Sequence, residues 1–89
     1  MKNIILTIMD KPGSFVYDIE VPAGQPGGTL TEDVLEVLND VNPNLRLYSG
    51  CHCLYLNRQR RPLTDQETLA GAGVRNGDYI TVISRVQED

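Results

Sequence analysis

Hydrophobic and polar positions alternate at the start of the chain and predict a β-hairpin. In residues 4–9 successive side chains would point to opposite faces of a strand, and residues 15–21 alternate in the same way. A turn cluster at residues 11–14 separates the two segments. Because Asp18 and Glu20 give the second strand a polar face, we expect it to lie at an edge of the sheet.

A helical period follows a glycine-rich break at residues 24–28. Apolar residues recur at intervals of three or four positions and form one stripe of an amphipathic helix: Leu30, Val34, Leu35, Leu38 and Val41. Thr29 and Glu32 have the spacing of a capping box, which satisfies free N–H groups at a helix start. Asn42 and Pro43 mark the end, so the helix is about three turns long and can cross a small sheet.

The pattern beyond the helix predicts three more strands. An irregular stretch covers residues 44–50, and a strand follows at about 51–56. A polar turn at residues 57–60 leads to a short segment that ends at Leu63, and the last strand covers residues 78–84. Before the last strand, residues 64–73 permit only a short helical turn, and Asn76-Gly77 is a turn signal. Without repeats or a linker, this order predicts one α+β domain over residues 1–89, with an ordered core at about 2–85.

The helix stripe must pack against one face of the strands, through a crossover that should be right-handed. The expected core residues are Ile4, Leu6, Ile8, Val21, Leu54, Leu56, Ile80 and Val82, with Leu63, Leu69 and Val74 closing the ends. Side chains at alternate positions then face away from the helix: Ile5 and Met9 of the first strand, Cys53 and Tyr55 of the third, and Tyr79, Thr81 and Ile83 of the last.

The charge of the chain limits its classes of partner. The 89 residues carry twelve acidic and eight basic side chains, a formal net charge of −4. Nucleic-acid-binding domains are basic with clustered Lys and Arg, so no nucleic acid is expected. The longest apolar run, residues 4–9, is too short to span a bilayer, and no signal peptide is predicted. Two cysteines this close together form no disulfide framework, which favours the reducing cytoplasm.

Segments near the C-terminus resemble a known family. Residues 63–69 and 74–82 are similar to the C-terminal half of ubiquitin-like β-grasp domains, in which an Asn-Gly-Asp motif introduces the last strand. Within that superfamily, residues 68–78 are most similar to the YukD/EsaB group, small ubiquitin-like proteins associated with type VII secretion systems of Gram-positive bacteria. Residues 15–23 also resemble the second strand of that group.

The resemblance implies a mixed five-stranded sheet with one main helix packed on one face. It also implies an accessory or regulatory protein that is not an enzyme and that binds another protein, such as a membrane or ATPase component of the secretion system. Its expected location is the cytoplasm, at the periphery of a membrane complex through that partner. No cofactor, small-molecule substrate or direct membrane insertion is expected.

The triplet Cys51-His52-Cys53 is the strongest candidate for chemistry. On a strand the two cysteines would project to one face and the histidine to the other, and no second ligand cluster exists, so we expect no metal site. A nucleophilic cysteine needs a base within hydrogen-bond reach, and neighbouring strand residues face apart. The glycine-rich residues 24–28 lack the Gly-Lys-[Ser/Thr] ending of a phosphate loop. Catalysis is therefore not expected.

Three arginines, Arg58, Arg60 and Arg61, gather in one turn of this acidic chain. They are either a solvated turn or a docking point for an acidic partner surface, since arginine is enriched at interfaces. Exposed Tyr, Ile and Met side chains on the sheet face away from the helix suit recognition of a protein. The candidate partner-binding residues are Met9, Tyr55, Arg58, Arg60, Arg61, Tyr79, Thr81 and Ile83.

An alternative function is a ubiquitin-like carrier or modifier that is activated at its C-terminus. Such proteins end in Gly-Gly, whereas this sequence ends in Gln87-Glu88-Asp89 and has Gly27-Gly28 before the helix. The carrier is therefore disfavoured. A metal-binding or redox module at Cys51 and Cys53 is the third hypothesis.

Overall fold

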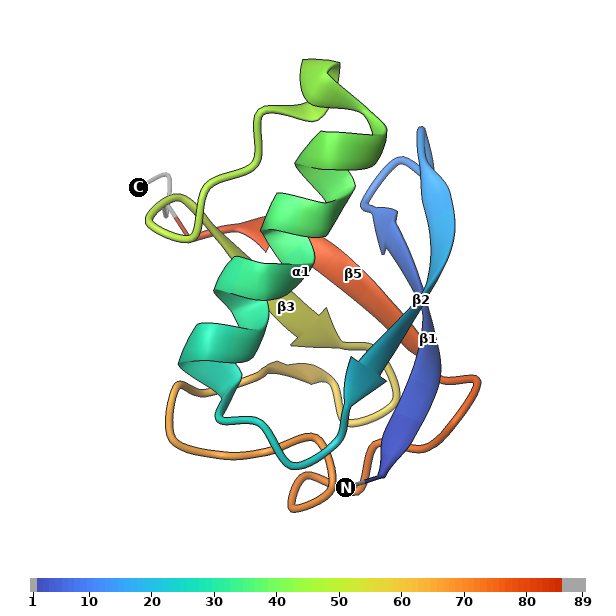
Figure 1. Ribbon diagram of the computed structural model, residues 1–89, viewed down its shortest axis with the longest axis vertical. Coiled ribbons are helices and arrows are strands. Elements are labelled where there is room, and N and C mark those ends of the chain that lie inside the picture. Colours follow the sequence, from blue (N-terminus) through green and yellow to red (C-terminus); the bar gives the residue numbers. More distant parts are fainter. Residues whose placement is uncertain (1, 86–89) are drawn as a thin grey trace.

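The computed structural model describes residues 2–85, and its elements follow the expected order (Figure 1). They are β1 (Asn3–Asp10), β2 (Val16–Pro22), α1 (Gly27–Val41), the 3-10 helix η1 (Pro43–Leu45), β3 (His52–Leu56), β4 (Arg61–Pro62) and β5 (Tyr79–Ser84). The alternating segments therefore form the predicted strands, and the helical stripe forms α1. No helix within the described residues is long and apolar enough to cross a membrane.

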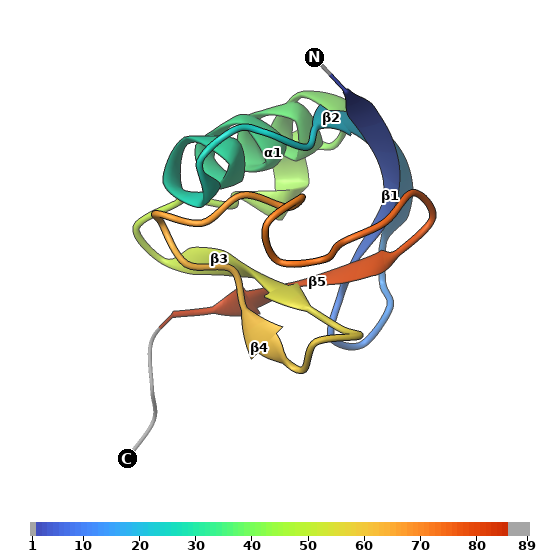
Figure 2. The ribbon, with the colours of Figure 1, turned by 90° about the horizontal axis from the view of Figure 1, so that it is seen from below.

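The strands of this part of the chain form one five-stranded sheet in the order β2-β1-β5-β3-β4. β1 and β5 are parallel, and the other three neighbouring pairs are antiparallel. Figure 2 shows α1 over one face of this sheet. The prediction of a mixed sheet with one main helix on one face is confirmed, and β2 is the edge strand that its polar face predicted.

The core lies between α1 and the facing side of the sheet. Every strand and loop residue that the sequence predicts for the core is buried. The helix contributes Leu30, Val34, Leu35 and Leu38, together with the buried Thr31, whose hydroxyl donates to the Gly27 carbonyl (2.7 Å). The expectation for Val41 was wrong, because its side chain is 58% exposed. Val41 is the last residue of α1, where the chain leaves the sheet and turns into η1.

The start of α1 differs from the predicted capping box. The helix begins at Gly27, its N-cap is Pro26, and no side chain caps it. Instead, the amides of Gly27 and Gly28 donate to the backbone carbonyls of Glu67 (2.7 Å) and Asp65 (3.1 Å). The helix therefore starts before Thr29, and the backbone of a distant segment satisfies its first N–H groups.

Gly27 is required by this contact. A Cβ atom at position 27 would lie 2.0 Å from the Thr64 carbonyl oxygen and 2.9 Å from Cγ of Leu63. No such approach occurs between real atoms, so only glycine lets the helix start this close to residues 63–67. Of the glycines in residues 24–28, Gly27 alone has this packing role, since a Cβ at Gly24 would meet no atom within 4 Å and one at Gly28 would make only an ordinary contact.

The segment between β4 and β5 is held by turns. In place of a helix it contains successive hydrogen-bonded turns, among them those from the Ala72 amide to the Thr68 carbonyl (3.0 Å) and from the Gly73 amide to the Ala70 carbonyl (3.1 Å). The side chain of Asn76 accepts from the Ile5 amide (2.7 Å), and the Gly77 amide donates to the Ile5 carbonyl (2.7 Å). With φ of 91°, Gly77 adopts a conformation that favours glycine. The Asn-Gly turn thus attaches the entry to β5 directly to β1.

Candidate interaction surface

The outer face of the sheet, opposite α1, brings the predicted strand residues together. Met9 pairs with Thr81, and Thr81 pairs with Tyr55, so these three side chains form a row over β1, β5 and β3. The same register extends the row to Val16 on β2 and Pro62 on β4. We call these five residues, together with Ile5, Tyr79 and Ile83, the outer patch.

The outer patch contains exposed apolar and aromatic groups. Tyr79, Val16 and Ile5 are 58%, 55% and 47% exposed, and Met9, Tyr55, Thr81 and Ile83 are half-buried. The Thr81 hydroxyl donates to the Asn57 side chain (2.7 Å) and is therefore already hydrogen-bonded within the chain. The rings of Tyr55 and Tyr79 are then the main groups of the patch available for contact. Sequence reasoning missed Val16, although the alternation that places Tyr17 and Ile19 toward the core assigns Val16 to the outer face.

An open groove of about 990 Å³ lies at one end of the patch. It forms where β1 ends at Asp10 while β5 continues to Ser84. Tyr55, Thr81 and Ile83 line it from the sheet, and Lys11 and Pro12 line it from the turn between β1 and β2. The groove therefore opens beside the row.

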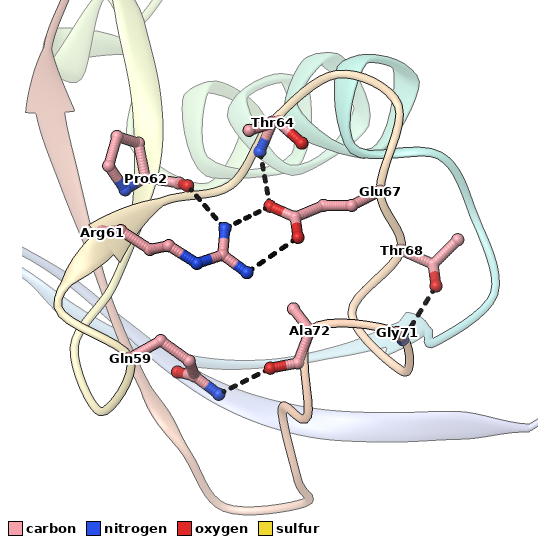
Figure 3. Close-up of polar contacts among 8 residues, drawn as sticks. All are labelled: Gln59, Arg61, Pro62, Thr64, Glu67, Thr68, Gly71 and Ala72. Carbon is pink, nitrogen blue, oxygen red and sulfur yellow. Dashed lines mark hydrogen bonds and ion pairs between the residues drawn. The ribbon is translucent and has the colours of Figure 1, made fainter.

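Two of the three arginines have partners within the chain. The guanidinium of Arg61 donates to both carboxylate oxygens of Glu67 (2.6 and 2.8 Å), and Thr64 donates its amide to the same carboxylate (2.8 Å; Figure 3). Arg61 and the Thr64 amide hold the pKa of Glu67 at about 2, below its ordinary value of 4.5. Arg58 is paired with Asp78 (2.8 Å) and also donates to the Gly73 carbonyl. The Arg58 guanidinium likewise keeps the pKa of Asp78 below its ordinary value.

These arginines fasten the segment before β5 to the β3–β4 turn, through Arg58, and to β4, through Arg61. Gln59 adds a bond from its side-chain amide to the Ala72 carbonyl (3.0 Å; Figure 3). Arg60 is different: its side chain is exposed, its φ is 61°, and it makes no ion pair among residues 2–85. Of the three arginines, Arg60 is therefore the one that makes no ion pair within residues 2–85, while the side chains of Arg58 and Arg61 are about half exposed (50% and 43%).

The two cysteines differ in exposure. Cys51 precedes β3 and is exposed, whereas Cys53 lies in β3, where its pairing with Ile83 puts it on the outer face as predicted, but its side chain is buried. Burial raises the pKa of the Cys53 thiol, which disfavours a reactive thiolate. The ring Nδ1 of His52 lies 3.2 Å from the Tyr48 amide, which donates to it. Within residues 2–85, no three His, Cys, Asp or Glu side chains are placed to hold a metal ion.

The C-terminal residues Gln87, Glu88 and Asp89, on which the carrier alternative depends, lie outside the described residues.

Comparisons with known proteins agree with the geometry. Residues 4–82 match the family model described as the WXG100 protein secretion system (Wss), protein YukD. No curated protein sequence matches the chain. The fold is similar to the ubiquitin-like domain of the Mycobacterium tuberculosis type VII secretion system protein ECCD1, with 24% identity over 94% of this chain and 100% of that chain and a TM-score of 0.74.

Two further solved structures have the same fold. The ubiquitin of Caldiarchaeum subterraneum is 24% identical over 99% of this chain and 100% of its own, with a TM-score of 0.67. A chain of the MycP5-free ESX-5 inner membrane complex in State II is 19% identical over all of this chain, with a TM-score of 0.78, and the match spans only 22% of that longer chain. The β-grasp fold and the resemblance to the YukD group are therefore confirmed.

Proposed function

The chain belongs to the YukD family of the WXG100 protein secretion system, and from this premise we propose that it is a non-catalytic protein-interaction domain with an accessory or regulatory role in a bacterial type VII secretion system. Its partner is another protein, for which a membrane or ATPase component of the secretion system is the leading candidate. The presence of a domain with the same fold in a longer chain of the MycP5-free ESX-5 inner membrane complex supports this choice. The domain would then work in the cytoplasm, at the periphery of such a complex.

The observation that carries the proposal is the outer patch. It joins exposed Tyr79, Val16 and Ile5 to the half-buried row through Met9, Thr81 and Tyr55, beside an open groove. Large amphipathic rings on a rigid sheet give contact area with little loss of side-chain entropy, which is typical of protein interfaces. A surface of this composition supports binding of a protein as its function.

The proposed contact residues have two roles. Met9, Tyr55, Tyr79, Thr81, Ile83 and Arg60 would touch the partner directly. Arg58 and Arg61 stay in the proposed surface because about half of each side chain is exposed, but they also hold the neighbouring segment through Asp78 and Glu67. Substituting either of these two would change the fold and the surface together, so tests of binding should leave them intact.

A pair of double variants tests the proposal. The first double variant, Tyr79→Ala with Arg60→Glu, removes a tyrosine ring of the outer patch and reverses the charge of Arg60. The control, Tyr48→Ala with Arg46→Glu, makes the same chemical changes elsewhere: Tyr48 is 59% exposed, and Arg46 is exposed with φ of 53°. The composition and net charge of the two variants are therefore identical.

Each variant, purified with a tag and matched to wild type in thermal stability, would be used to capture partners from the source cells. Loss of a buried interface tyrosine weakens binding by about 30-fold. We expect the Tyr79/Arg60 variant to lose the main partner and the control to retain it. Equal capture by both variants would show that the partner binds elsewhere.

A further inference from the structure

The two edges of the sheet are protected very differently. β4 is only two residues long and includes Pro62, which lacks an N–H group, so that edge offers little to a pairing strand. β2, at the other edge, is seven residues long, and its proline, Pro22, is its last residue. Among the described residues no strand pairs with the outer edge of β2. Figure 1 shows β2 at the side of the molecule next to α1.

An exposed apolar line on α1 lies on the same side as this edge. The side chain of Asn39 makes two hydrogen bonds with the backbone of Leu47: its Nδ2 donates to the Leu47 carbonyl (2.7 Å), and its Oδ1 accepts from the Leu47 amide (2.9 Å). The flank of α1 that carries Asn39 therefore faces the segment that leads to β3. Val37 and Val41 are each two residues from Asn39, a rotation of about 200° around the helix. They therefore occupy the opposite flank, on which the β1–β2 hairpin lies (Figure 1).

Both valines are large apolar side chains left in solvent, with 42% and 58% of their surface exposed. On β2 the side chains that face the helix layer are Tyr17 and Ile19, which pack against the core but remain partly exposed. Partly exposed apolar side chains therefore lie both on this helix flank and on the inner side of the edge strand.

The charged residues on β2 and α1 all have one sign. β2 carries Asp18 and Glu20, and α1 carries Glu32, Asp33, Glu36 and Asp40, all exposed. These two elements hold six of the twelve acidic residues of the chain and none of the eight basic ones. Asp33 lies one turn before Val37, on the apolar flank itself. A second copy of β2 pairing with this edge would place acids near acids, which is unfavourable.

We propose that β2 and the Val37–Val41 flank of α1 form a second docking site, which takes up an extended segment of a partner protein as a sixth strand. The segment alternates apolar and basic residues. Its apolar side chains face the helix layer, next to Tyr17, Ile19, Val37 and Val41. Its lysines or arginines lie on the outer side of the sheet, next to Asp18 and Glu20. Backbone hydrogen bonds supply affinity, and the alternating neighbours set the register.

This site meets the outer patch at Val16 but does not include Tyr79 on β5, so the two surfaces can be told apart by where binding occurs. The probe is a synthetic seven-residue peptide of alternating lysine and valine with blocked ends, titrated into the ¹⁵N-labelled domain up to about 1 mM. We expect saturable binding that shifts the amide resonances of β2 and of Val37 and Val41 and leaves those around Tyr79 unchanged. No binding, or shifts centred on β5, would overturn the proposal.

Two controls separate strand addition from simple attraction of a cation to an acidic surface. One version of the peptide carries methyl groups on the backbone nitrogens of its odd-numbered residues, and a second version carries them on its even-numbered residues. One of these two peptides should lose binding and the other should keep it. Equal binding by both methylated peptides would overturn the proposal.

Val37→Ser with Val41→Ser should weaken binding about tenfold, whereas Tyr48→Ala should not change it. Dimerisation of the domain through β2, detected by sedimentation, would replace the partner segment with a second copy and would also overturn it.

Discussion

The contact between Gly27 and the segment before β5 leads to a sharp prediction about stability, because Gly28 provides a control one residue away. In Gly27→Ala the new Cβ would lie 2.0 Å from the Thr64 carbonyl oxygen and 2.9 Å from Leu63 Cγ. In Gly28→Ala the nearest atom would be Asp65 Cβ at 3.4 Å, an ordinary contact. The two variants thus add the same methyl group to the same helix turn.

The expected magnitudes are well separated. Overpacking of this kind costs about 1–3 kcal/mol, and the forced separation weakens two backbone hydrogen bonds that contribute about 1 kcal/mol each. We therefore expect Gly27→Ala to destabilise the domain by about 3 kcal/mol, which lowers the Tm of a domain of this size by about 12–24 °C. Gly28→Ala should be neutral or stabilise by up to about 1 kcal/mol, since alanine is a better helix former than glycine.

Urea unfolding followed by circular dichroism, together with calorimetry, measures both free energies. A Gly27→Ala protein that fails to fold while Gly28→Ala folds normally would agree with the prediction. Equal stability of the two alanine variants would refute the argument that a close backbone approach, and not flexibility, is the reason for glycine at position 27.

Two further predictions concern the segment before β5. Because Glu67 has a folded-state pKa of about 2, below its ordinary 4.5, its ionised form contributes stability that is fully present above pH 4.5 and is lost as the pH falls toward 2. Glu67→Gln should therefore cost about 1 kcal/mol at neutral pH and show a flatter decline of unfolding free energy between these two pH values; parallel pH profiles for the two proteins would contradict this account. Asn76→Ala removes the acceptor for the Ile5 amide and should cost about 1 kcal/mol in urea unfolding. Asn76→Asp keeps an acceptor oxygen and should retain most of that stability, so equal losses in both variants would show that the bond to β1 is not the cause.

The sequence predicted most of the fold because its pattern has two clear periods. Alternation places Leu6, Leu54 and Ile80 on one strand face, and the helical stripe places Val34 and Leu38 opposite them. The neighbourhood of β1, β5 and β3, which brings the residues of the outer patch into one row, does not follow from periodicity. It depends on the strand order of the β-grasp sheet, in which β5 lies between β1 and β3.

Several of the failures share a physical cause, which is contact between different elements of the fold that no local pattern reports. The start of α1 is satisfied by the backbone of residues 65–67, so the local spacing of Thr29 and Glu32 was misleading. Ion pairs with acidic residues of the segment before β5 occupy Arg58 and Arg61, and no local pattern distinguishes them from Arg60. Burial of Cys53 on the face away from the helix also depends on tertiary packing.

The central claim is that a partner protein binds the outer patch, and site-specific photo-crosslinking tests it most directly. The photoreactive residue benzoylphenylalanine would replace Tyr79 in one protein and Tyr48 in another, since the two tyrosines are equally exposed (58% and 59%). Both proteins would be illuminated in the source cells. The account predicts a discrete covalent adduct with one partner from position 79 and none from position 48. An adduct from position 48 alone, or none from either position, would contradict it.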